Sequence, residues 1–211
     1  MKRISLSIVG VLLTVMSTVA QVIKLDAGAT FSSMQDDTPL HQFTGNNTGF
    51  SALLGIDWLE HEYFYLSSQV GYMATGGTDH IYLTNEQGVH SDILDWHMRR
   101  DNFHINTTFR ARVPFGRFHA YVGVGPKLDI PLYARMSDNL NMEYASADVP
   151  FFQRDVMFGV KTELGLVYDF EYISLGVNFS FLPDITRQAS YLNQTTRNNT
   201  FTLGVSLGYM L

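Results

Sequence analysis

The sequence predicts an all-β protein, an eight-stranded antiparallel up-and-down transmembrane β-barrel. Three observations support this prediction: eight segments in which apolar residues alternate with polar residues or glycine, connections that are alternately long and short, and a leader-like N-terminus. Successive residues of a strand point to opposite faces, so alternation gives each strand one apolar and one polar face. Eight such segments of about ten residues each are typical of an outer-membrane barrel.

The first 20 residues have the layout of a secretory signal peptide. Lys2 and Arg3 precede an uncharged apolar run at 4–16, and the small residue Ala20 precedes a cleavage site. The apolar run is too short to cross a bilayer of about 30 Å as a helix, which disfavours the alternative of an uncleaved anchor. The chain therefore divides into a signal peptide, residues 1–20, cleaved after Ala20, and an outer-membrane barrel domain, residues 21–211.

Eight strands follow the leader. They are expected, in chain order, at 24–31, 50–58, 64–72, 103–113, 120–132, 156–166, 173–181 and 201–211. In each of them one parity is apolar, as in Phe50, Ala52, Leu54, Ile56 and Trp58 of the second strand. The opposite parity is polar or glycine, so one face of every strand is suited to lipid and the other to a lumen.

The connections between these strands alternate in length. Long loops are expected at 33–48, 75–101, 134–153 and 183–199, and short turns at 60–62, 114–117 and 169–171. Bacterial outer-membrane barrels combine short periplasmic turns with longer outer loops. With a periplasmic N-terminus, all four long loops lie outside the cell.

A soluble lipocalin-like barrel is the competing interpretation, with its apolar faces turned inward around a ligand cavity. Its polar faces would then form the wet exterior and would be rich in Lys, Glu and Thr. Here the polar face carries most of the 17 glycines of the chain. Small residues suit a crowded interior or a tightly curved wall, which favours the membrane barrel.

The inward face also carries a set of nearly balanced charges. The predicted lumen network consists of Lys24, Asp26, Asp57, Arg110, Arg112, Lys127, Asp129, Lys161 and Glu163. Buried charges are costly unless they are paired, so cross-strand ion pairs are expected in the lumen. Because eight strands enclose a space that side chains nearly fill, the lumen is expected to be largely closed; a path for protons or ions is the alternative.

Composition limits the chemistry that this chain can perform. The absence of cysteine excludes disulfides, Cys-based zinc sites and thiol catalysis. The formal net charge of −6 disfavours a nucleic-acid partner. No phosphate-binding loop or paired-histidine zinc motif is present, so no cofactor and no metal are expected. The run His90-Ser91-Asp92 has the residue types of a hydrolytic triad, but neighbours in one loop do not form a triad.

Aromatic residues gather near the expected periplasmic rim. They are Trp58, Tyr63, Phe64, Tyr168, Phe170, Tyr172 and Tyr209. Amphipathic rings prefer the level of the lipid headgroups, so this set is interpreted as the lower aromatic girdle of the barrel.

Two segments resemble a known family. Residues 120–128, which read Ala-Tyr-Val-Gly-Val-Gly-Pro-Lys-Leu, and residues 203–211, with Gly208-Tyr209, are similar to the fifth and last strands of small Bacteroidetes outer-membrane barrels, a group that includes PorT-like proteins. The chain departs from that pattern at Asn106-Thr107-Thr108, where a proline is common, and at Leu211, where Phe is common. The resemblance implies an OmpA-like eight-stranded barrel and no single activity.

The expected function is that of a non-enzymatic outer-membrane anchor that displays loops. Its expected partners are outer-membrane lipid and proteins that bind the outer loops or the periplasmic turns. Two alternatives remain: an accessory subunit of a secretion or gliding machinery, which the PorT-like resemblance suggests, and a lipid-A-modifying enzyme, which would need a serine and a histidine at one rim.

Overall fold

The computed structural model describes residues 20–36, 44–84, 90–138, 143–145, 156–186, 188–189 and 195–211. The expected signal peptide therefore lies outside the described residues, apart from Ala20, which begins the first strand. Within the described ranges, no helix is long and apolar enough to cross a membrane.

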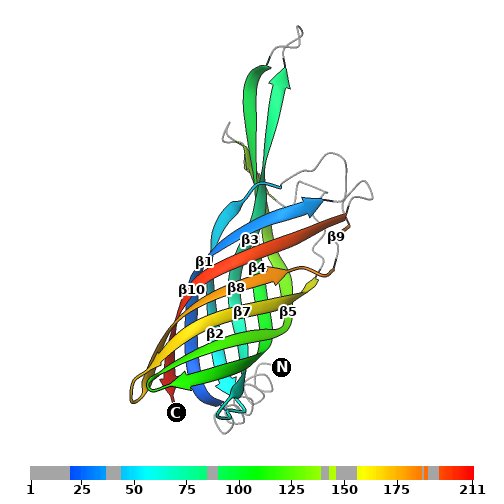
Figure 1. The fold of residues 1–211 in the computed structure, drawn as a ribbon. Coiled ribbons are helices and arrows are strands. Elements are labelled where there is room, and N and C mark those ends of the chain that lie inside the picture. The colour runs from blue at the N-terminus through cyan, green and yellow to red at the C-terminus, as the bar shows by residue number, and fades with distance from the viewer. Residues whose placement is uncertain are drawn as a thin grey trace, which may run out of the picture.

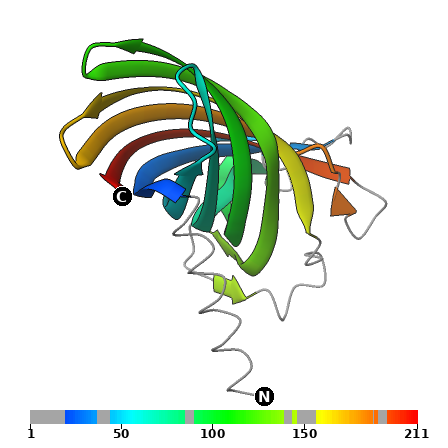
Figure 2. The same ribbon diagram turned by 90° about the horizontal axis from the view of Figure 1, so that it is seen from below.

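The structure is an antiparallel barrel of eight long strands with two short additional ones (Figures 1 and 2). The strands are β1 (Ala20–Asp36), β2 (Asn47–Trp58), β3 (Phe64–Thr84), β4 (His90–Phe115), β5 (Phe118–Asp138), β6 (Glu143–Ala145), β7 (Met157–Asp169), β8 (Ile173–Pro183), β9 (Gln188–Ala189) and β10 (Thr195–Met210). The long strands pair in chain order, and β10 returns to β1 to close the wall. The predicted fold class is confirmed.

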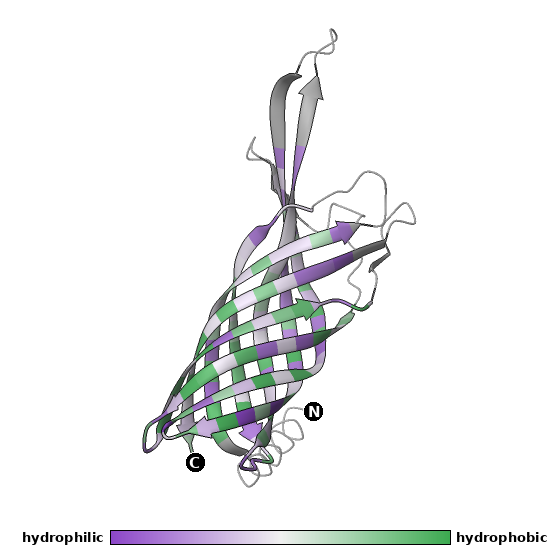
Figure 3. Cartoon of the chain, viewed as in Figure 1, coloured by the Kyte–Doolittle hydropathy of each residue, from purple (hydrophilic) through white to green (hydrophobic). Residues whose placement is uncertain are grey.

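The wall follows the alternation in the sequence. In β5, for example, Val122 is 63% exposed on the outer surface, whereas its neighbour Tyr121 is 4% exposed in the lumen. The pairs Leu25↔Leu207 and Leu54↔Leu25 continue the apolar surface across strand boundaries. Figure 3 shows hydrophobic bands alternating with polar ones along the strands. The barrel is thus apolar outside and polar inside, the reverse of a soluble protein.

Two lumen glycines provide space for their neighbours. A Cβ at Gly165 would lie 2.5 Å from the ring of Tyr121, and a Cβ at Gly125 would lie 1.9 Å from the backbone oxygen of Thr107. Glycine at these positions lets a large inward side chain lie flat, or lets one strand approach its neighbour closely. The glycine-rich inward face therefore belongs to a crowded interior.

The prediction of a long loop at 75–101 is wrong. β3 extends to Thr84 and β4 begins at His90, and the two are paired as far as Thr84↔His90. This hairpin projects well beyond the rest of the wall (Figure 1). The strands predicted from the sequence end at Tyr72 and resume at Phe103, but the backbone pairing of β3 with β4 continues past both residues. The sequence pattern therefore predicted strands that are shorter than those in the structure.

The other predicted loops are also shorter than expected among the described residues. β1 extends to Asp36, β5 to Asp138, and β10 begins at Thr195. Within these predicted loops the structure also contains a bridge at Gly45, the strands β6 and β9, and a bridge at Asp184, and most of their other residues lie outside the described ranges. The short turns fall at one end, which we call the short-turn end; the opposite end, where β3 and β4 project, is the hairpin end (Figure 1). The C-terminus lies at the short-turn end.

Candidate functional site: the barrel lumen

A layer of buried charges crosses the middle of the lumen. Arg110 of β4 donates to Glu163 of β7 through Nε at 2.6 Å and Nη2 at 3.0 Å. Lys161 Nζ lies 3.0 Å from the same carboxylate, and Thr108 Oγ1 donates to it at 2.7 Å. The Arg110, Lys161 and Glu163 side chains are 4%, 6% and 1% exposed. One carboxylate thus holds two cations across the barrel, and we call this set the central layer.

Aromatic rings cover the central layer on the side of the short-turn end. The guanidinium carbon of Arg110 lies 4.5 Å from the ring centroid of Tyr121 and 5.7 Å from that of Tyr65. The two rings meet edge to face at 6.2 Å. Cation–π contacts strengthen when they are shielded from water, as they are here. The rings of Tyr65 and Tyr121 therefore fill space in the lumen next to the charged side chains.

Asp26 was expected to join an ion pair, but its hydrogen bonds come from amides. Gln69 Nε2 donates to Asp26 Oδ2, and Asn178 Nδ2 donates to Oδ1 at 3.4 Å. Gln69 in turn accepts from Lys161 Nζ at 2.6 Å, which links Asp26 to the central layer. The space beside these residues is about 20 Å³, enough for about one water molecule.

The lumen opens at the short-turn end into a cavity of about 310 Å³. Lys24 lies at its inner edge, 2.7 Å from Asp57 Oδ1, and donates to Ser67 at 2.6 Å. Arg112 does not join the lumen pairs. It donates to Glu60 Oε1 at 2.5 Å and to the carbonyl oxygens of the adjacent turn, so it fixes that turn at the mouth.

A second buried group occupies the half of the lumen nearer the hairpin end. Lys127 Nζ lies 2.7 Å from Asp129 and 2.5 Å from Asp184. His104 Nδ1 lies 2.5 Å from the other oxygen of Asp129, and Asn106 contacts His104 Nε2 at 3.0 Å. Both ring nitrogens of His104 are therefore occupied, which leaves neither free to act as a general base.

Three buried polar residues of this half of the lumen were not predicted from the sequence. Asp184 and Arg100 were expected in loops, and His104 was placed on the inward face but was not counted as a charge. Arg100 is 3% exposed and donates to Met157 Sδ at 3.0 Å. Of these three residues, only His104 could have been predicted as a lumen residue, because it lies at an inward-facing position of its predicted strand. Asp184 enters the lumen because the chain continues to pair after β8, with a bridge from Gly159 to Asp184.

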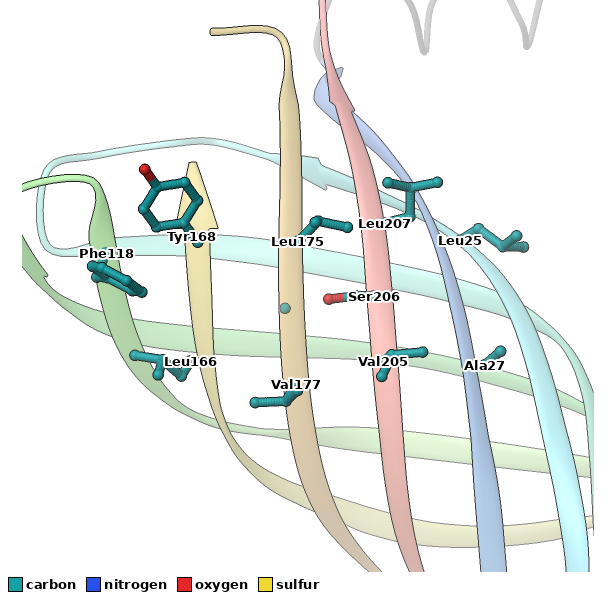
Figure 4. A pocket seen from close by; sticks show the side chains of 11 residues that line it. Leu25, Ala27, Phe118, Leu166, Tyr168, Leu175, Val177, Val205, Ser206 and Leu207 are labelled. Atoms are coloured by element: carbon teal, nitrogen blue, oxygen red, sulfur yellow. The ribbon is translucent and has the colours of Figure 1, made fainter. Parts of the chain in front are cut away.

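The outer wall carries a shallow apolar depression of about 500 Å³ near the short-turn end. Figure 4 shows its lining side chains spread over β1, β5, β7, β8 and β10, with Phe118 and Tyr168 at one side. The centroids of these two rings are 4.6 Å apart, and the centroids of the Tyr168 and Phe170 rings are 4.7 Å apart. Aromatic residues thus cluster at the rim at which the girdle was predicted.

The histidines do not form a catalytic constellation in the described part of the chain. His80 and Asp95 pair at 2.5 Å on the exposed hairpin, and His119 pairs with Asp169 at 2.9 Å at the mouth. The side chains of His90, Ser91 and Asp92 lie outside the described set, although their backbone belongs to β4. Among the described residues, no group of three or more His, Asp or Glu side chains could hold a metal ion.

Together these features define an eight-stranded up-and-down β-barrel with an apolar exterior and a charged, tightly packed lumen. Neither a protein-family model nor a curated protein sequence matches the chain.

Several solved structures resemble this fold. OprG from Pseudomonas aeruginosa is 11% identical over 92% of this chain and 97% of its own, with a TM-score of 0.49. Neisserial surface protein A is 12% identical over 90% and 97%, with a TM-score of 0.48. Ail, the attachment invasion locus protein of Yersinia pestis, is 10% identical over 90% and 99%, with a TM-score of 0.43. At these identities the likeness concerns the fold alone.

Proposed function

We propose that this protein is a non-enzymatic outer-membrane barrel that anchors the β3–β4 hairpin and displays it outside the cell. The apolar exterior supports insertion into a bilayer, since charged groups on a lipid-facing wall are strongly disfavoured. The alternating lengths of the connections support an orientation with the short turns in the periplasm. The sequence of the leader supports export, with cleavage after Ala20.

The observation that carries this proposal is the central layer. Glu163 forms hydrogen bonds with Arg110 and a salt bridge with Lys161, and Arg110 lies over the rings of Tyr65 and Tyr121. No continuous water-filled path is therefore expected across the barrel. A closed lumen argues against a diffusion channel for nutrients. What the barrel then offers to its surroundings is a stable platform, and its most prominent external feature is the hairpin.

The lumen also gives little support for catalysis. His104 has both ring nitrogens engaged and is fully buried, and His119 lies at the periplasmic mouth against Asp169. Acyl transfer needs a nucleophile within hydrogen-bond reach of a base. Comparison of lipid A from wild-type and deletion strains by mass spectrometry tests the enzymatic alternative. A role in a secretion or gliding machinery, suggested by the PorT-like resemblance, is tested by co-purification from membranes.

Two measurements test the display function directly. An epitope inserted between Thr84 and His90 is expected to bind antibody on intact cells, whereas one inserted at Gly116 in a short turn is expected to need permeabilised cells. Purified protein in planar bilayers is expected to show no large, stable, ohmic conductance. The reverse epitope pattern would contradict the orientation, and a porin-scale current would make transport the leading function.

A further inference from the structure

The projecting hairpin has two open edges among the described residues. β2 pairs with β3 only as far as Ser51↔Met73, followed by an isolated bridge to Thr78. β4 pairs with β5 only from Trp96 inward. Beyond these points, residues 79–84 of β3 and 90–95 of β4 pair only with each other. Among the described residues, each of these stretches therefore presents a row of backbone N–H and C=O groups without a neighbouring strand.

Other strand edges at this end of the barrel are covered by short extended segments. β6 adds to Arg135–Ser137 of β5, and β9 adds to the start of β10. Gly45 and Thr78 exchange two backbone hydrogen bonds, of 2.9 and 3.0 Å, on the outer side of β3. Strand addition is thus the recurrent way in which this end of the barrel satisfies its backbone. An exposed edge is a template for a further strand.

The edge of β4 is acidic in sequence. Residues 90–95 include Asp92 and Asp95 and contain no Lys or Arg, whereas the edge of β3 at 79–84 has only Asp79. The Asp95 side chain is 38% exposed and pairs with His80 of β3 at 2.5 Å. An incoming strand with positive side chains would find opposite charges beside it, and opposite charges on adjacent strands stabilise pairing.

A second copy of this chain is a poorer occupant of that edge. Two copies in one membrane are related by an axis along the membrane normal, which makes like edges run parallel and sets Asp92 and Asp95 near their counterparts. Pairing β3 of one copy with β4 of another is heterologous, so it builds a ring or an open filament and not a two-fold dimer. The geometry therefore favours a different protein.

We propose that the outer edge of β4, residues 90–95, binds an extended, Lys- or Arg-rich segment of another protein by strand addition. This inference rests on the proposed display function, because the edge must face the outside to meet such a partner. Main-chain hydrogen bonds supply affinity in this mode of recognition, and side chains of the added strand supply specificity.

Backbone hydrogen bonds of β3 and β4 identify which amides of β4 face the open edge. Arg112 N donates to Tyr63 O at 2.8 Å, so even-numbered amides of β4 point toward β3. The β3–β4 register has no shift from Phe64↔Ala111 to Leu83↔Asp92, so this parity holds along the hairpin. The amide of Ile93 therefore points to the open edge of β4.

The same register identifies the matched control positions. Thr78 of β3 bonds Gly45 on the side away from β4, so even-numbered amides of β3, including that of Tyr82, point outward. The amide of Leu94 points inward to β3. Proline lacks an N–H, and so it removes one open-edge donor at Ile93 or Tyr82 but breaks the hairpin ladder at Leu94.

The test uses the full chain in lipid nanodiscs and fluorescence anisotropy. The probe is a labelled ten-residue peptide that alternates Lys and Val, compared with one that alternates Glu and Val. Ile93→Pro is expected to weaken binding of the Lys peptide about fivefold or more, as loss of backbone pairing at this edge requires. Ile93→Thr keeps the amide, and Tyr82→Pro alters only the other edge, so both are expected to bind within about twofold of wild type.

Hydrogen exchange of the hairpin controls for folding. Protection is expected to persist in Ile93→Pro and to be lost in Leu94→Pro. The proposal is overturned if the Lys peptide does not bind, if the Glu peptide binds equally well, if Ile93→Pro leaves binding unchanged, or if Tyr82→Pro weakens it as much as Ile93→Pro. Antibody binding to the hairpin epitope on intact cells measures display separately, so failure of peptide binding with a displayed epitope refutes only this inference.

Discussion

Replacing Glu163 by Gln tests whether the central layer holds the barrel together and closes it. The Glu163 carboxylate accepts two hydrogen bonds from Arg110 and one from Thr108, and it lies 3.0 Å from Lys161 Nζ. Gln has the same shape but no charge, and its amide group would face a guanidinium donor. Both cations would remain buried in the lumen without their shared carboxylate.

The expected loss follows from that geometry. Removing one partner of a buried ion pair costs about 3–5 kcal/mol, because the other charge remains buried without compensation. Glu163 serves two cations, so we expect the upper part of that range. Asp26→Asn is the matched control: Asp26 is also a buried lumen acid, but its oxygens accept from Gln69 and Asn178 amides, so its loss strands no cation and is expected to cost about 1–3 kcal/mol.

The assay is urea-induced unfolding of the barrel in lipid vesicles, followed by tryptophan fluorescence and by gel mobility without heating. Trp58 is a suitable reporter because its indole donates to Ser68 at 3.1 Å within the folded wall. Bilayer recordings of the same variant measure whether the lumen opens. A Glu163→Gln barrel as stable as wild type would refute the idea that this carboxylate compensates the two cations. Stability losses equal to those of Asp26→Asn would have the same consequence.

Four further predictions concern the wall, the lumen, the rim and the membrane. Val160→Arg, on the outer wall next to Lys161 of the central layer, is expected to lower folding stability in bilayers by about 2–4 kcal/mol. No change in stability would mean that the inward and outward faces of β7 are assigned wrongly by one residue. Gly159→Ala should destabilise by steric conflict, since a Cβ there would lie 2.3 Å from Pro183 O, and the same urea titration measures it. Glu60→Gln, in a more exposed pair with Arg112, should cost no more than about 1 kcal/mol. The protein should fractionate with outer membranes and show heat-modifiable mobility, and recovery as a soluble monomer without detergent would contradict this.

The strand pattern was predictable because each residue in the wall of the barrel faces either the apolar exterior or the polar lumen. Val122 and Tyr121 are neighbours in sequence with opposite exposure, and the alternation of apolar and polar residues records that directly. The short turns were predictable for a related reason, since the apolar alternation resumes within a few residues of each turn. Fold class and the inward set of charges therefore followed from periodicity alone.

The partners of those charges were not predictable. Parity places Asp26, Arg112 and Glu163 on the inward face but does not give the tilt of the strands or the reach of a side chain across the lumen. The structure gives Glu163 two cations, gives Asp26 amide donors, and directs Arg112 to the rim turn. Register between strands decides these pairings, and register is a tertiary property.

The sequence by itself determined which residues face lipid and which face the lumen, because hydrophobic burial acts on every residue of a strand with a period of two. Only the tertiary structure decided how far the strands continue past the apolar belt. Backbone hydrogen bonds extend β3 to Thr84 and β4 back to His90, well past the ends of the strands that the sequence predicted. The same pairing beyond β8 brings Asp184 into the lumen beside Lys127. Periodicity shows which face of a strand is apolar, but it does not show where the backbone pairing between two strands ends.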